Sequence, residues 1–403
     1  MENKRQKIEI ADIFRRFESE YIEQHELIHE QHKAFNAIMN CRSQELGGHT
    51  LKCDNCGNVQ HAYNSCRNRH CPKCQYLKQV MWVDKLKTRL LPVKYFHMVF
   101  TIPSSMHRLF YANQAICYDL LMKSASQAIL KAGENPAFLG AKTGCVAILH
   151  TWGQALTYHP HVHLLVPSGG FDSDMLEWRQ SEDDFFAPVK ALSSLFRGIF
   201  AQNIYKHADD LIPDKDGEKT DIDFLRKLIY KTRWNVFAKP ALSNAENVIE
   251  YLGRYTHRVA ISNARILEIA DDKVHFVWKD YKQNGRTKVM KLEAIEFINR
   301  FMLHVLPNGF YKIRYYGIFA NTHCNEVLDT YLSVEDKEMV LSLTEGKAWQ
   351  DLIEEVLGYD PFRCKKCKKG KMLMHEKSCL FYECYYIKEH FYNHSQAALG
   401  FAS

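Results

Sequence analysis

Long apolar runs are missing from this sequence of 403 residues. The longest, from Tyr95 to Ile102, is far shorter than the roughly 20 residues that cross a bilayer, and it contains His97. The first ten residues, MENKRQKIEI, are charged and lack the apolar centre of a signal peptide. Internal repeats and low-complexity tracts are also absent. These absences argue against a membrane protein and a secreted protein, so we expect a cytoplasmic chain with no membrane partner.

The composition is that of a globular protein, with 46% hydrophobic and 25% charged residues. It argues against a disordered, collagen-like or coiled-coil chain, and the length predicts two or three domains. The net charge of +6 is unevenly placed. Between Cys41 and Lys94 there are ten basic and three acidic residues, so this segment alone carries +7. A compact cationic segment indicates a polyanionic partner, although a solvated surface without a ligand has the same composition.

Cysteine is abundant, and its pattern indicates metal rather than disulfides. The count of 13 is odd, and many of these residues form C-x-x-C pairs, as expected for metal ligands in a reducing cytoplasm. In CDNCGNVQHAYNSCRNRHCPKC, one pair is separated from the next by 14 residues. Two such pairs complete a tetrahedral four-thiolate zinc site. The predicted ligands of this structural zinc are Cys53, Cys56, Cys71 and Cys74.

Further metal ligands are predicted on either side of these pairs. A second zinc ion has four candidate ligands, each of which could instead be packed or hydrogen-bonded: Cys41, His49, Cys66 and His70. Near the C-terminus, RCKKCKKGK contains Cys364 and Cys367, which form either another zinc knuckle or only part of a basic tail. Possible partners of that pair are His375, Cys379 and Cys384. Cations beside the zinc ligands would be held rigidly and suit phosphate contacts, and they are Arg67, Arg69 and Lys73.

Hydrophobic periodicity predicts helices at both ends of a strand-rich middle. Helices are expected over residues 8–40, 75–91, 189–208, 243–255 and 293–306. Strands are expected at YFHMVFTIP, CVAILHTWG, HVHLLVP, VAISNARILEI, KVHFVWKDY, TKVMKL and KIRYYGIFA. Turns are expected at Asp271-Asp272 and Asn284-Gly285. The pattern therefore predicts an α+β protein.

A cluster of histidines follows the second of these strands, in HTWGQALTYHPHVHLLVPSGG. His161 and His163 alternate around Val162, so on a strand both side chains lie on one face. Two imidazoles so placed can hold a divalent ion. If the chain doubles back after the preceding strand, His150 becomes the third ligand, with Gln154 and His159 as alternatives. The competing interpretation is a set of strand histidines satisfied by hydrogen bonds.

Two tyrosines lie further along the chain, in NVIEYLGRYTHRVAISN. Tyr251 and Tyr255 are four residues apart on a predicted helix, so their hydroxyls share one face. Arg254 and Arg258 could neutralise phosphate charge beside them. Such a pair alone is typical of a core or an interface. Beside a histidine-bound ion that polarises a phosphate, however, a tyrosine can act as a nucleophile although its ordinary pKa is near 10.

These motifs resemble a known family. HVH after an apolar strand, with Tyr-x-x-x-Tyr downstream, resembles the HUH (histidine–hydrophobic–histidine) endonucleases, and FTIP at residues 100–103 is similar to the first motif of rolling-circle replication initiators. More closely, six stretches within residues 10–325 resemble the two-tyrosine transposases of the IS-ninety-one insertion-sequence family. They are LGGH, YNSCRNRHCPKCQ, HTWGQ, HPHVH, YLGRYTHRVAISN and HVLPNGFYKIRYYG. After residue 335, only a C-x-x-C pair matches.

The resemblance implies a fold and a reaction. The fold is a central antiparallel sheet with flanking helices, preceded here by a helical and zinc-binding module. The reaction is cleavage and rejoining of single-stranded DNA at transposon ends and target through 5′-phosphotyrosine, with Tyr251 and Tyr255 as nucleophiles and Mg²⁺ or Mn²⁺ on His161 and His163. A prokaryotic protein associated with the nucleoid is implied. No Walker-type phosphate loop occurs, so strand separation would depend on a host helicase or on supercoiling.

The predicted domains are 1–91, a helical and zinc-binding DNA-binding domain; 92–330, the catalytic domain; and 331–403, a helical tail. Three other functions fit part of the pattern. A zinc-ribbon DNA-binding regulator leaves the histidines and tyrosines unexplained. A hydrolase with a water nucleophile does not need the tyrosines. A plasmid replication initiator or relaxase would share the chemistry in another biological setting.

Overall fold

The computed structural model describes residues 8–172, 174–175, 177–182, 185–213, 220–242, 260–280, 283–322, 324–335, 347, 354 and 360–378. The chain forms two compact units. We call Met1–Leu77 with Gly346–Ser403 the terminal unit, and Lys78–Glu345 the sheet unit. The sequence predicted three consecutive domains, 1–91, 92–330 and 331–403. The structure divides the chain differently, because a strand close to the C-terminus pairs with a strand of the N-terminal region.

The described part of the terminal unit contains three short helices and a three-stranded antiparallel sheet of order β13-β1-β2. Its helices are α1 (Ile10–Arg16), α2 (Glu18–Gln24) and α3 (His29–Met39), and its strands are β1 (Gly48–Cys53), β2 (Val59–Tyr63) and β13 (Met372–Ser378). The single helix expected over residues 8–40 is therefore wrong. Phe17 leaves the helical region at φ −115°, and the chain folds back so that Phe14 stacks on Phe35 with ring centroids 4.9 Å apart. Helix α4 (Gln75–Lys87) follows, as expected.

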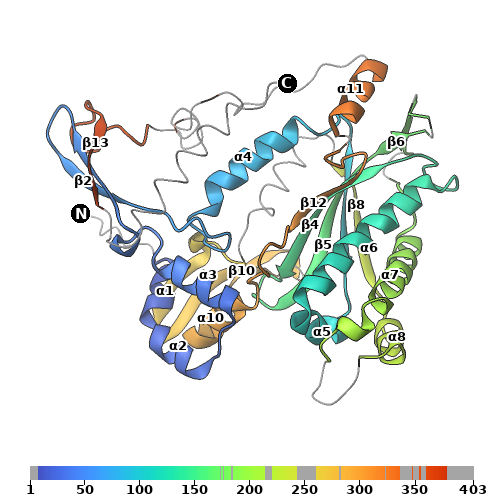
Figure 1. Ribbon diagram of the computed structural model, residues 1–403, viewed down its shortest axis with the longest axis horizontal. Coiled ribbons are helices and arrows are strands. Elements are labelled where there is room, and N and C mark those ends of the chain that lie inside the picture. The colour runs from blue at the N-terminus through green and yellow to red at the C-terminus, as the bar shows by residue number, and fades with distance from the viewer. Residues whose placement is uncertain are drawn as a thin grey trace. The chain divides into compact units, whose positions relative to one another are not determined.

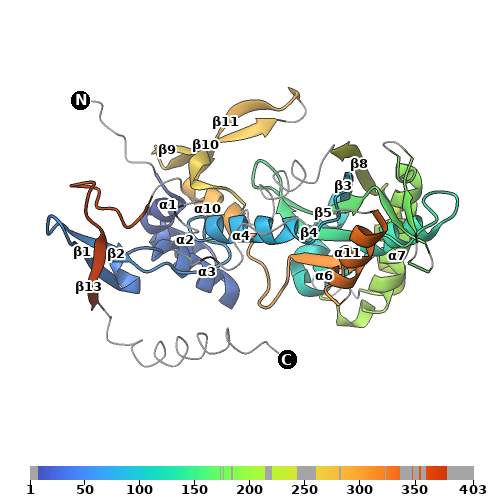
Figure 2. The same ribbon diagram turned by 90° about the horizontal axis from the view of Figure 1, so that it is seen from above.

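The sheet unit is built on a five-stranded sheet of order β12-β4-β5-β3-β8, in which every neighbouring pair is antiparallel (Figures 1 and 2). The strands are β3 (Tyr95–Thr101), β4 (Gly144–Trp152), β5 (Tyr158–Pro167), β8 (Asn235–Leu242) and β12 (Ile313–Gly317). The predicted strands at YFHMVFTIP, CVAILHTWG, HVHLLVP and KIRYYGIFA are confirmed. Strand β5 lies at the centre, so the HVH residues occupy the middle of the sheet.

Alternation along the strands gives this sheet two different faces. Phe96, Met98 and Phe100 of β3 point into the main core, which α6 (Gln114–Glu134) and α7 (Val189–Tyr205) cover (Figure 1). On the other face, part of the surface packs on a smaller cluster that includes Leu86 and Leu90. The remainder of that face carries the histidines. The protein is thus α+β, with an antiparallel sheet and helices as predicted.

The sheet unit has further elements outside this sheet. They are α5 (His107–Ala112), β6 (Gly169–Phe171), β7 (Trp178–Gln180), α8 (Ile222–Tyr230), β9 (Ile266–Ala270), β10 (Lys273–Asp280), β11 (Arg286–Glu293), α10 (Ala294–Met302) and α11 (Cys324–Glu335). The β9-β10-β11 meander is antiparallel, and positive φ angles at Asp271, Asp272, Asn284 and Gly285 confirm its two turns. Strand β9 starts later than expected, because Asn263–Arg265 forms a 3₁₀ turn. The helix predicted over 243–255 lies outside the described residues. None of the helices described is long and apolar enough to cross a membrane.

Candidate functional site

Three histidines meet on one face of the central hairpin, which β4 and β5 form. His150 on β4 lies directly opposite His161 on β5, and Ile148 lies opposite His163. Because opposed residues of an antiparallel pair share a face, all three imidazoles project to the same side. Their potential ligand nitrogens lie within 4.8 Å of one another, and all three residues are buried. The structure thus places His150 beside the two HVH histidines.

Hydrogen bonds orient two of these rings. His161 Nδ1 lies 2.6 Å from the carbonyl oxygen of His159, and this contact requires Nδ1 to carry the proton. The lone pair of His161 is then on Nε2. His163 Nδ1 lies 2.8 Å from Nε2 of His97, a buried residue of β3, and the two rings stack 5.1 Å apart at 9°. With the proton on His163 Nδ1, the lone pair of that ring also sits on Nε2. Orientation of this kind is typical of imidazoles that bind a metal.

Burial keeps these imidazoles neutral. Loss of solvation lowers the pKa of His161 to about 4, and it lowers the pKa of His163 well below its ordinary value, with His150 adding to the effect. At neutral pH both rings are therefore unprotonated and can donate lone pairs. Neutral imidazoles are ligands for divalent transition ions, and Zn²⁺ in particular accepts them readily. The donor set therefore fits a divalent metal.

The connection between β4 and β5 is held by side chains from later in the chain. Arg265 Nη2 donates to the carbonyl oxygen of Gln154 at 2.7 Å. The buried His304 contacts both the end of β4 and the connection, with Nδ1 3.2 Å from Thr151 Oγ1 and Nε2 3.1 Å from the carbonyl oxygen of Leu156. These contacts fix the hairpin that carries the histidines. The alternative ligand His159 does not join the group of three histidines.

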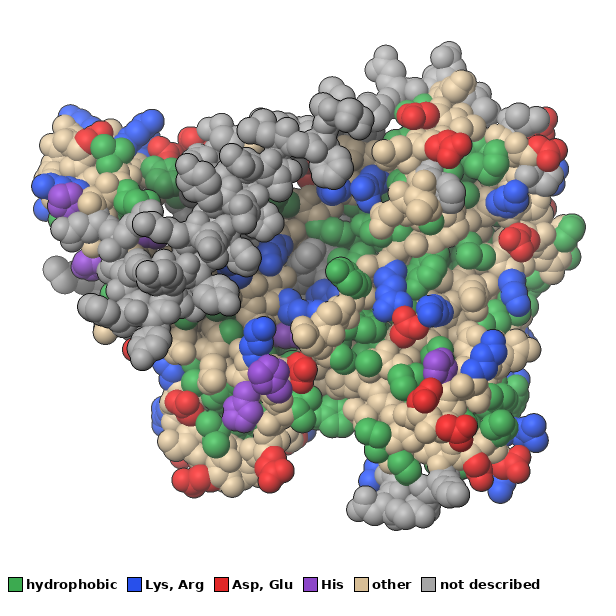
Figure 3. Space-filling model, viewed as in Figure 1, with side chains coloured by type: hydrophobic (Ala, Val, Ile, Leu, Met, Phe, Trp, Pro, Cys, Tyr) green, Lys and Arg blue, Asp and Glu red, His purple; other side chains and the backbone are tan. Residues whose placement is uncertain are grey.

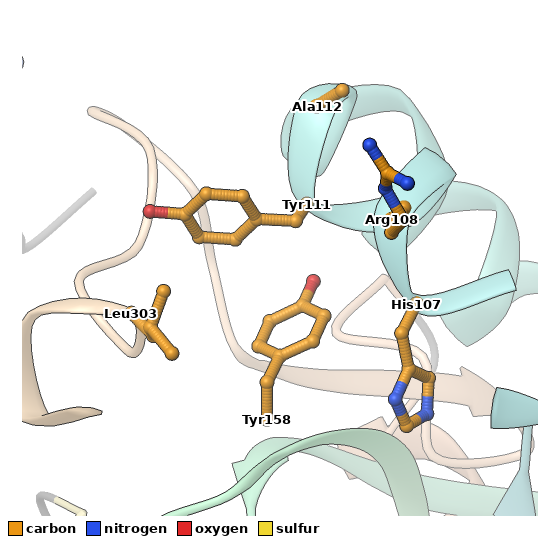
Figure 4. A pocket seen from close by; sticks show the side chains of 6 residues that line it. All are labelled: His107, Arg108, Tyr111, Ala112, Tyr158 and Leu303. Atoms are coloured by element: carbon orange, nitrogen blue, oxygen red, sulfur yellow. The ribbon is translucent and has the colours of Figure 1, made fainter. Parts of the chain in front are cut away.

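A pocket of about 390 Å³ adjoins the histidines (Figure 4). It is lined by His107, Arg108, Tyr111, Ala112, Tyr158 and Leu303. The His107 and His159 rings lie 5.9 Å apart, and the His159 and His161 rings 5.1 Å apart, so ring contacts link the pocket lining to the trio. Figure 4 shows the Tyr111 and Tyr158 rings in the space between α5 and the segment carrying Leu303. Among the described residues, Nε2 of His107 is buried without a hydrogen-bond partner. The pocket combines aromatic faces with one arginine and one unsatisfied imidazole.

Eight cysteines of the terminal unit form two groups of four, in a pairing that differs from the predicted one. Cys41, Cys66, Cys71 and Cys74 form the first group, with Sγ of Cys74 3.5 Å from Sγ of Cys41 and 3.6 Å from Sγ of Cys66. Hydrogen bonding to Cys41 first, then to Cys66 and Cys71, lowers the pKa of Cys74. Four thiol groups so close together are the donor set of structural zinc.

The second group joins Cys53 and Cys56 to the distant Cys364 and Cys367. The pairs Cys53–Cys56 and Cys71–Cys74, which the sequence predicted in one site, therefore lie in two. His49 and His70 belong to neither group. His49 is a residue of β1, and His70 instead lies in a tight turn where its backbone N–H donates to Asn68 Oδ1. Sequence spacing misled here because the first pair finds its partners about 310 residues away.

The predicted DNA-contacting cations have different surroundings. Arg67 is exposed, whereas Arg69 is half-buried, which lowers its pKa. Lys73 forms an ion pair with Glu9 and is mostly covered. Arg254 and Arg258 lie outside the described residues, as do the predicted nucleophiles Tyr251 and Tyr255. His97 was not predicted as a site residue. The sequence indicates its position only through strand alternation: His97 lies on the same face of β3 as Val99, and Val99 pairs with His163.

Comparisons with known proteins agree with this arrangement. Residues 144–327 match the model of a family described as putative transposase, and residues 13–102 match a transposase zinc-binding domain. The chain is 41% identical over 379 residues to the putative transposase y4qJ of Sinorhizobium fredii, covering 91% of this chain and 94% of that protein. It is 26% identical over 339 residues to the transposase for insertion sequence element IS801 of Pseudomonas savastanoi pv. phaseolicola, covering 82% of this chain and 80% of the relative. No solved structure matches. The chain belongs to the transposases of the IS91 (IS-ninety-one) insertion-sequence family, and its substrate is DNA.

Proposed function

We propose that this transposase cuts and rejoins single-stranded DNA at transposon ends through 5′-phosphotyrosine intermediates, using an HUH catalytic centre. The observation that carries the proposal is the buried trio of His150, His161 and His163 on adjacent strands of an antiparallel sheet. The trio lies on the inner strands, where the HUH fold has its histidines. Membership in a transposase family favours this role over a replication initiator, a relaxase or a non-catalytic regulator.

The three histidines would hold one divalent ion, Mg²⁺ or Mn²⁺, through lone pairs that the surrounding hydrogen bonds direct. When bound, such an ion withdraws charge from the oxygens of a phosphate that contacts it. The protein supplies a rigid platform, because β4 and β5 are paired and their connection is tied down by Arg265 and His304. Zinc also accepts imidazole, so the ligand type does not identify the ion. Measuring cleavage with each ion in turn would identify it.

Tyr251 and Tyr255 would supply the nucleophiles. The phenolic oxygen of one attacks the scissile phosphorus and forms a P–O bond to tyrosine, while the bond to the 3′-oxygen breaks. The leaving oxygen takes a proton and becomes a free 3′-hydroxyl, and the phenol gives up its own proton. A 3′-hydroxyl attacking the phosphotyrosine reverses these bond changes and joins two strands. The tyrosyl ester conserves the phosphodiester bond, so rejoining needs no ATP.

The DNA strand would approach through the pocket beside the trio. Tyr111 and Tyr158 present ring faces and edges on which a base can stack, and Arg108 can contact a phosphate. Burial, reinforced by Tyr118, raises the pKa of Tyr158, so this tyrosine stays a neutral phenol. A nucleotide flanking the cut would therefore be held here. A host helicase or supercoiling would supply the single strand.

The first group of cysteines would hold structural zinc. Cys41, Cys66, Cys71 and Cys74 connect the end of α3 to the segment that leads into α4. The metal would fix the loop that presents Arg67, whose side chain is exposed. The transposase zinc-binding domain covers all four residues and supports this role. Folding and DNA binding would depend on this zinc, whereas the phosphoryl chemistry would not.

A covalent-adduct assay tests the proposal. Wild-type protein, single-stranded DNA containing a transposon end, and Mn²⁺ should give a protein–DNA band that survives denaturant. The Tyr251→Phe/Tyr255→Phe variant and the His161→Ala variant should give none while still binding the DNA. The matched control is Tyr230→Phe, an exposed tyrosine of α8, which should form the adduct normally. Efficient cleavage by the double tyrosine variant would rule out the tyrosines as nucleophiles.

A further inference from the structure

Two Cys-x-x-Cys turns from distant parts of the chain face one another in the terminal unit. Sγ of Cys53 lies 3.7 Å from Sγ of Cys367, and Sγ of Cys56 lies 3.8 Å from Sγ of Cys364. These separations are far too long for disulfides, whose S–S bond is about 2.05 Å. They match the edge of a zinc–thiolate tetrahedron, which is about 3.8 Å for Zn–S bonds of about 2.3 Å.

The two turns share one backbone geometry. The N–H of Gly57 donates to the carbonyl oxygen of Cys53 at 3.1 Å, and the N–H of Lys368 donates to that of Cys364 at 2.8 Å. Both donors have left-handed φ angles, +67° for Gly57 and +58° for Lys368. A lysine adopts this conformation only against its own steric preference. Its occurrence at the matching position indicates that each turn is shaped to direct two thiolates at one point.

Strand pairing brings the turns together. Cys53, the last residue of β1, pairs with Met372, the first residue of β13. Next to this pair, Asp54 Oδ1 accepts from the N–H of Lys371 at 2.8 Å. A Cβ on Gly370 would lie 2.6 Å from Sγ of Cys53, so only glycine allows this approach. The surrounding cluster of buried residues is very small, and ligand bonds would replace the missing core.

The turn from the C-terminal region is strongly cationic. Six exposed basic side chains occupy nine residues, and they are Arg363, Lys365, Lys366, Lys368, Lys369 and Lys371. Figure 3 shows several Lys and Arg side chains around the β1-β2-β13 sheet, with some acidic side chains between them. A zinc ion with four thiolates carries a net charge of −2, which two of these cations neutralise. The remaining positive charge suits a polyanion.

We propose that Cys53, Cys56, Cys364 and Cys367 bind one structural zinc ion, and that the split zinc ribbon so formed places its lysines on the phosphates of DNA. The ribbon is split because its two halves come from distant parts of the chain. The half that carries Cys364 and Cys367 lies outside residues 13–102, which match the zinc-binding domain. It adds a second metal and a second DNA-contacting surface. It does not depend on the tyrosine chemistry proposed above.

Zinc content of the full-length protein tests the metal site. Wild type should contain two zinc ions per chain, and the Cys364→Ser/Cys367→Ser variant one. Cobalt in place of zinc should show absorption from tetrahedral thiolate coordination, reduced by half in the variant. Cys324→Ser, a buried cysteine outside both groups, is the control and should keep both ions. Two zinc ions in the double variant would overturn the site.

Salt-dependent DNA binding tests the surface separately. The Lys365→Ala/Lys366→Ala/Lys368→Ala/Lys369→Ala variant should keep both zinc ions. The slope of log affinity against log salt should become shallower by about 3 to 4, since each phosphate contact contributes about 0.9. The control removes four exposed lysines of the sheet unit, Lys190, Lys206, Lys227 and Lys231, and should change the slope far less. Equal slopes in the two variants would refute the ribbon as a DNA surface. Binding is measured without Mg²⁺ or Mn²⁺, so failure of the catalytic proposal would not affect this result.

Discussion

Nε2 of His97 lies 2.8 Å from Nδ1 of His163, with the two rings stacked. His97 comes from β3 and His163 from β5, so the contact links two strands at the histidine face of the sheet. Burial, with a smaller effect from Lys239, lowers the pKa of His97 to about 4. A neutral His97 can accept the Nδ1 proton of His163, which leaves Nε2 of His163 available to the metal. His97 is thus a positioning residue for a proposed ligand.

Replacing His97 should weaken metal binding without removing a ligand. For His97→Ala we expect a loss of about 10- to 100-fold in Mn²⁺ affinity, the usual effect of removing the partner of a ligating histidine. Cleavage should recover at saturating Mn²⁺, and His97→Gln should restore part of the affinity. Calorimetry with Mn²⁺, together with cleavage rates across Mn²⁺ concentrations, measures both. The control is His275→Gln on β10, where the histidine pairs with Glu268. A His97→Ala variant with unchanged Mn²⁺ affinity would show that the contact is only packing.

The third metal ligand can be identified by comparing three variants. His150→Ala should lower the rate of cleavage by orders of magnitude, because it removes one of three donors within 4.8 Å. His159→Ala and Gln154→Ala should retain metal binding, because the backbone carbonyl oxygens that accept from His161 Nδ1 and from Arg265 remain in both variants. Mn²⁺ titrations of all three give the ranking. Normal metal dependence in His150→Ala, with loss in either of the others, would reassign the ligand.

Much of the sheet unit follows from local sequence pattern. The apolar runs around residues 95–101, 144–152 and 158–167 are long and rich in β-branched and aromatic residues, and they form adjacent strands. The alternation in HVH fixes a shared face, and the short connection before Tyr158 permits His150 to pair opposite His161. Strand periodicity therefore predicted the geometry of the trio, although not the contribution of His97, which depends on strand order.

The cysteine pairing could not be predicted in the same way. Ligand spacing is a local signal, and both C-x-x-C pairs near residues 53 and 71 satisfy it equally. Which pairs share an ion depends on β13 pairing with β1, a contact across more than 300 residues. The interruption of the first helix at Phe17 was also missed, because the apolar period continues through it while the backbone turns to pack Phe14 on Phe35. Tertiary packing overrides local propensity at such points.

Acid should destabilise the hairpin through His304. Burial lowers the pKa of His304 to about 4, below its ordinary value near 6.5. The unfolded chain therefore binds a proton more readily than the folded chain between these values, and stability falls as pH drops from about 6.5 to 4. Because of this one group, the free energy of unfolding should be about 2 kcal/mol lower at pH 5 than at pH 7.5. Denaturation by urea at both pH values measures it. The His304→Gln variant should lose that part of the difference in stability, whereas His207→Gln, at a partly exposed histidine, should not. Equal pH dependence in wild type and His304→Gln would contradict the assignment.

The two tyrosines should divide the strand-transfer cycle between them. If both act as nucleophiles, Tyr251→Phe and Tyr255→Phe should each allow some single cleavage but block complete transposition, because one adduct must be held while a second forms. Mass spectrometry of peptides from trapped adducts should then find DNA on both residues in the wild type. The alternative is one nucleophile and one tyrosine that packs or orients the phosphate. An adduct confined to one tyrosine, with normal transposition by the other's Phe variant, would establish that alternative.

Tyr111 should contribute to holding the DNA strand rather than to chemistry. The rings of Tyr111 and Tyr158 both line the pocket, with centroids 5.5 Å apart and nearly perpendicular planes. Tyr111 is 39% exposed, so replacing it should leave the core intact. Stacking of a base on an aromatic side chain is worth about 1–3 kcal/mol, so Tyr111→Ala should weaken binding of a short single-stranded oligonucleotide by about 5- to 150-fold. Tyr111→Phe and Tyr111→Trp keep a ring and should bind nearly as well as wild type, which separates stacking from hydrogen bonding by the hydroxyl. The control is Tyr311→Ala, a more exposed tyrosine outside the pocket lining.

Fluorescence anisotropy with oligonucleotides that carry an abasic site at successive positions should locate the base concerned, since removing it should abolish the difference between wild type and Tyr111→Ala. If every abasic substrate still distinguishes the two proteins, the pocket does not hold a single base, and Tyr111 affects DNA binding in some other way.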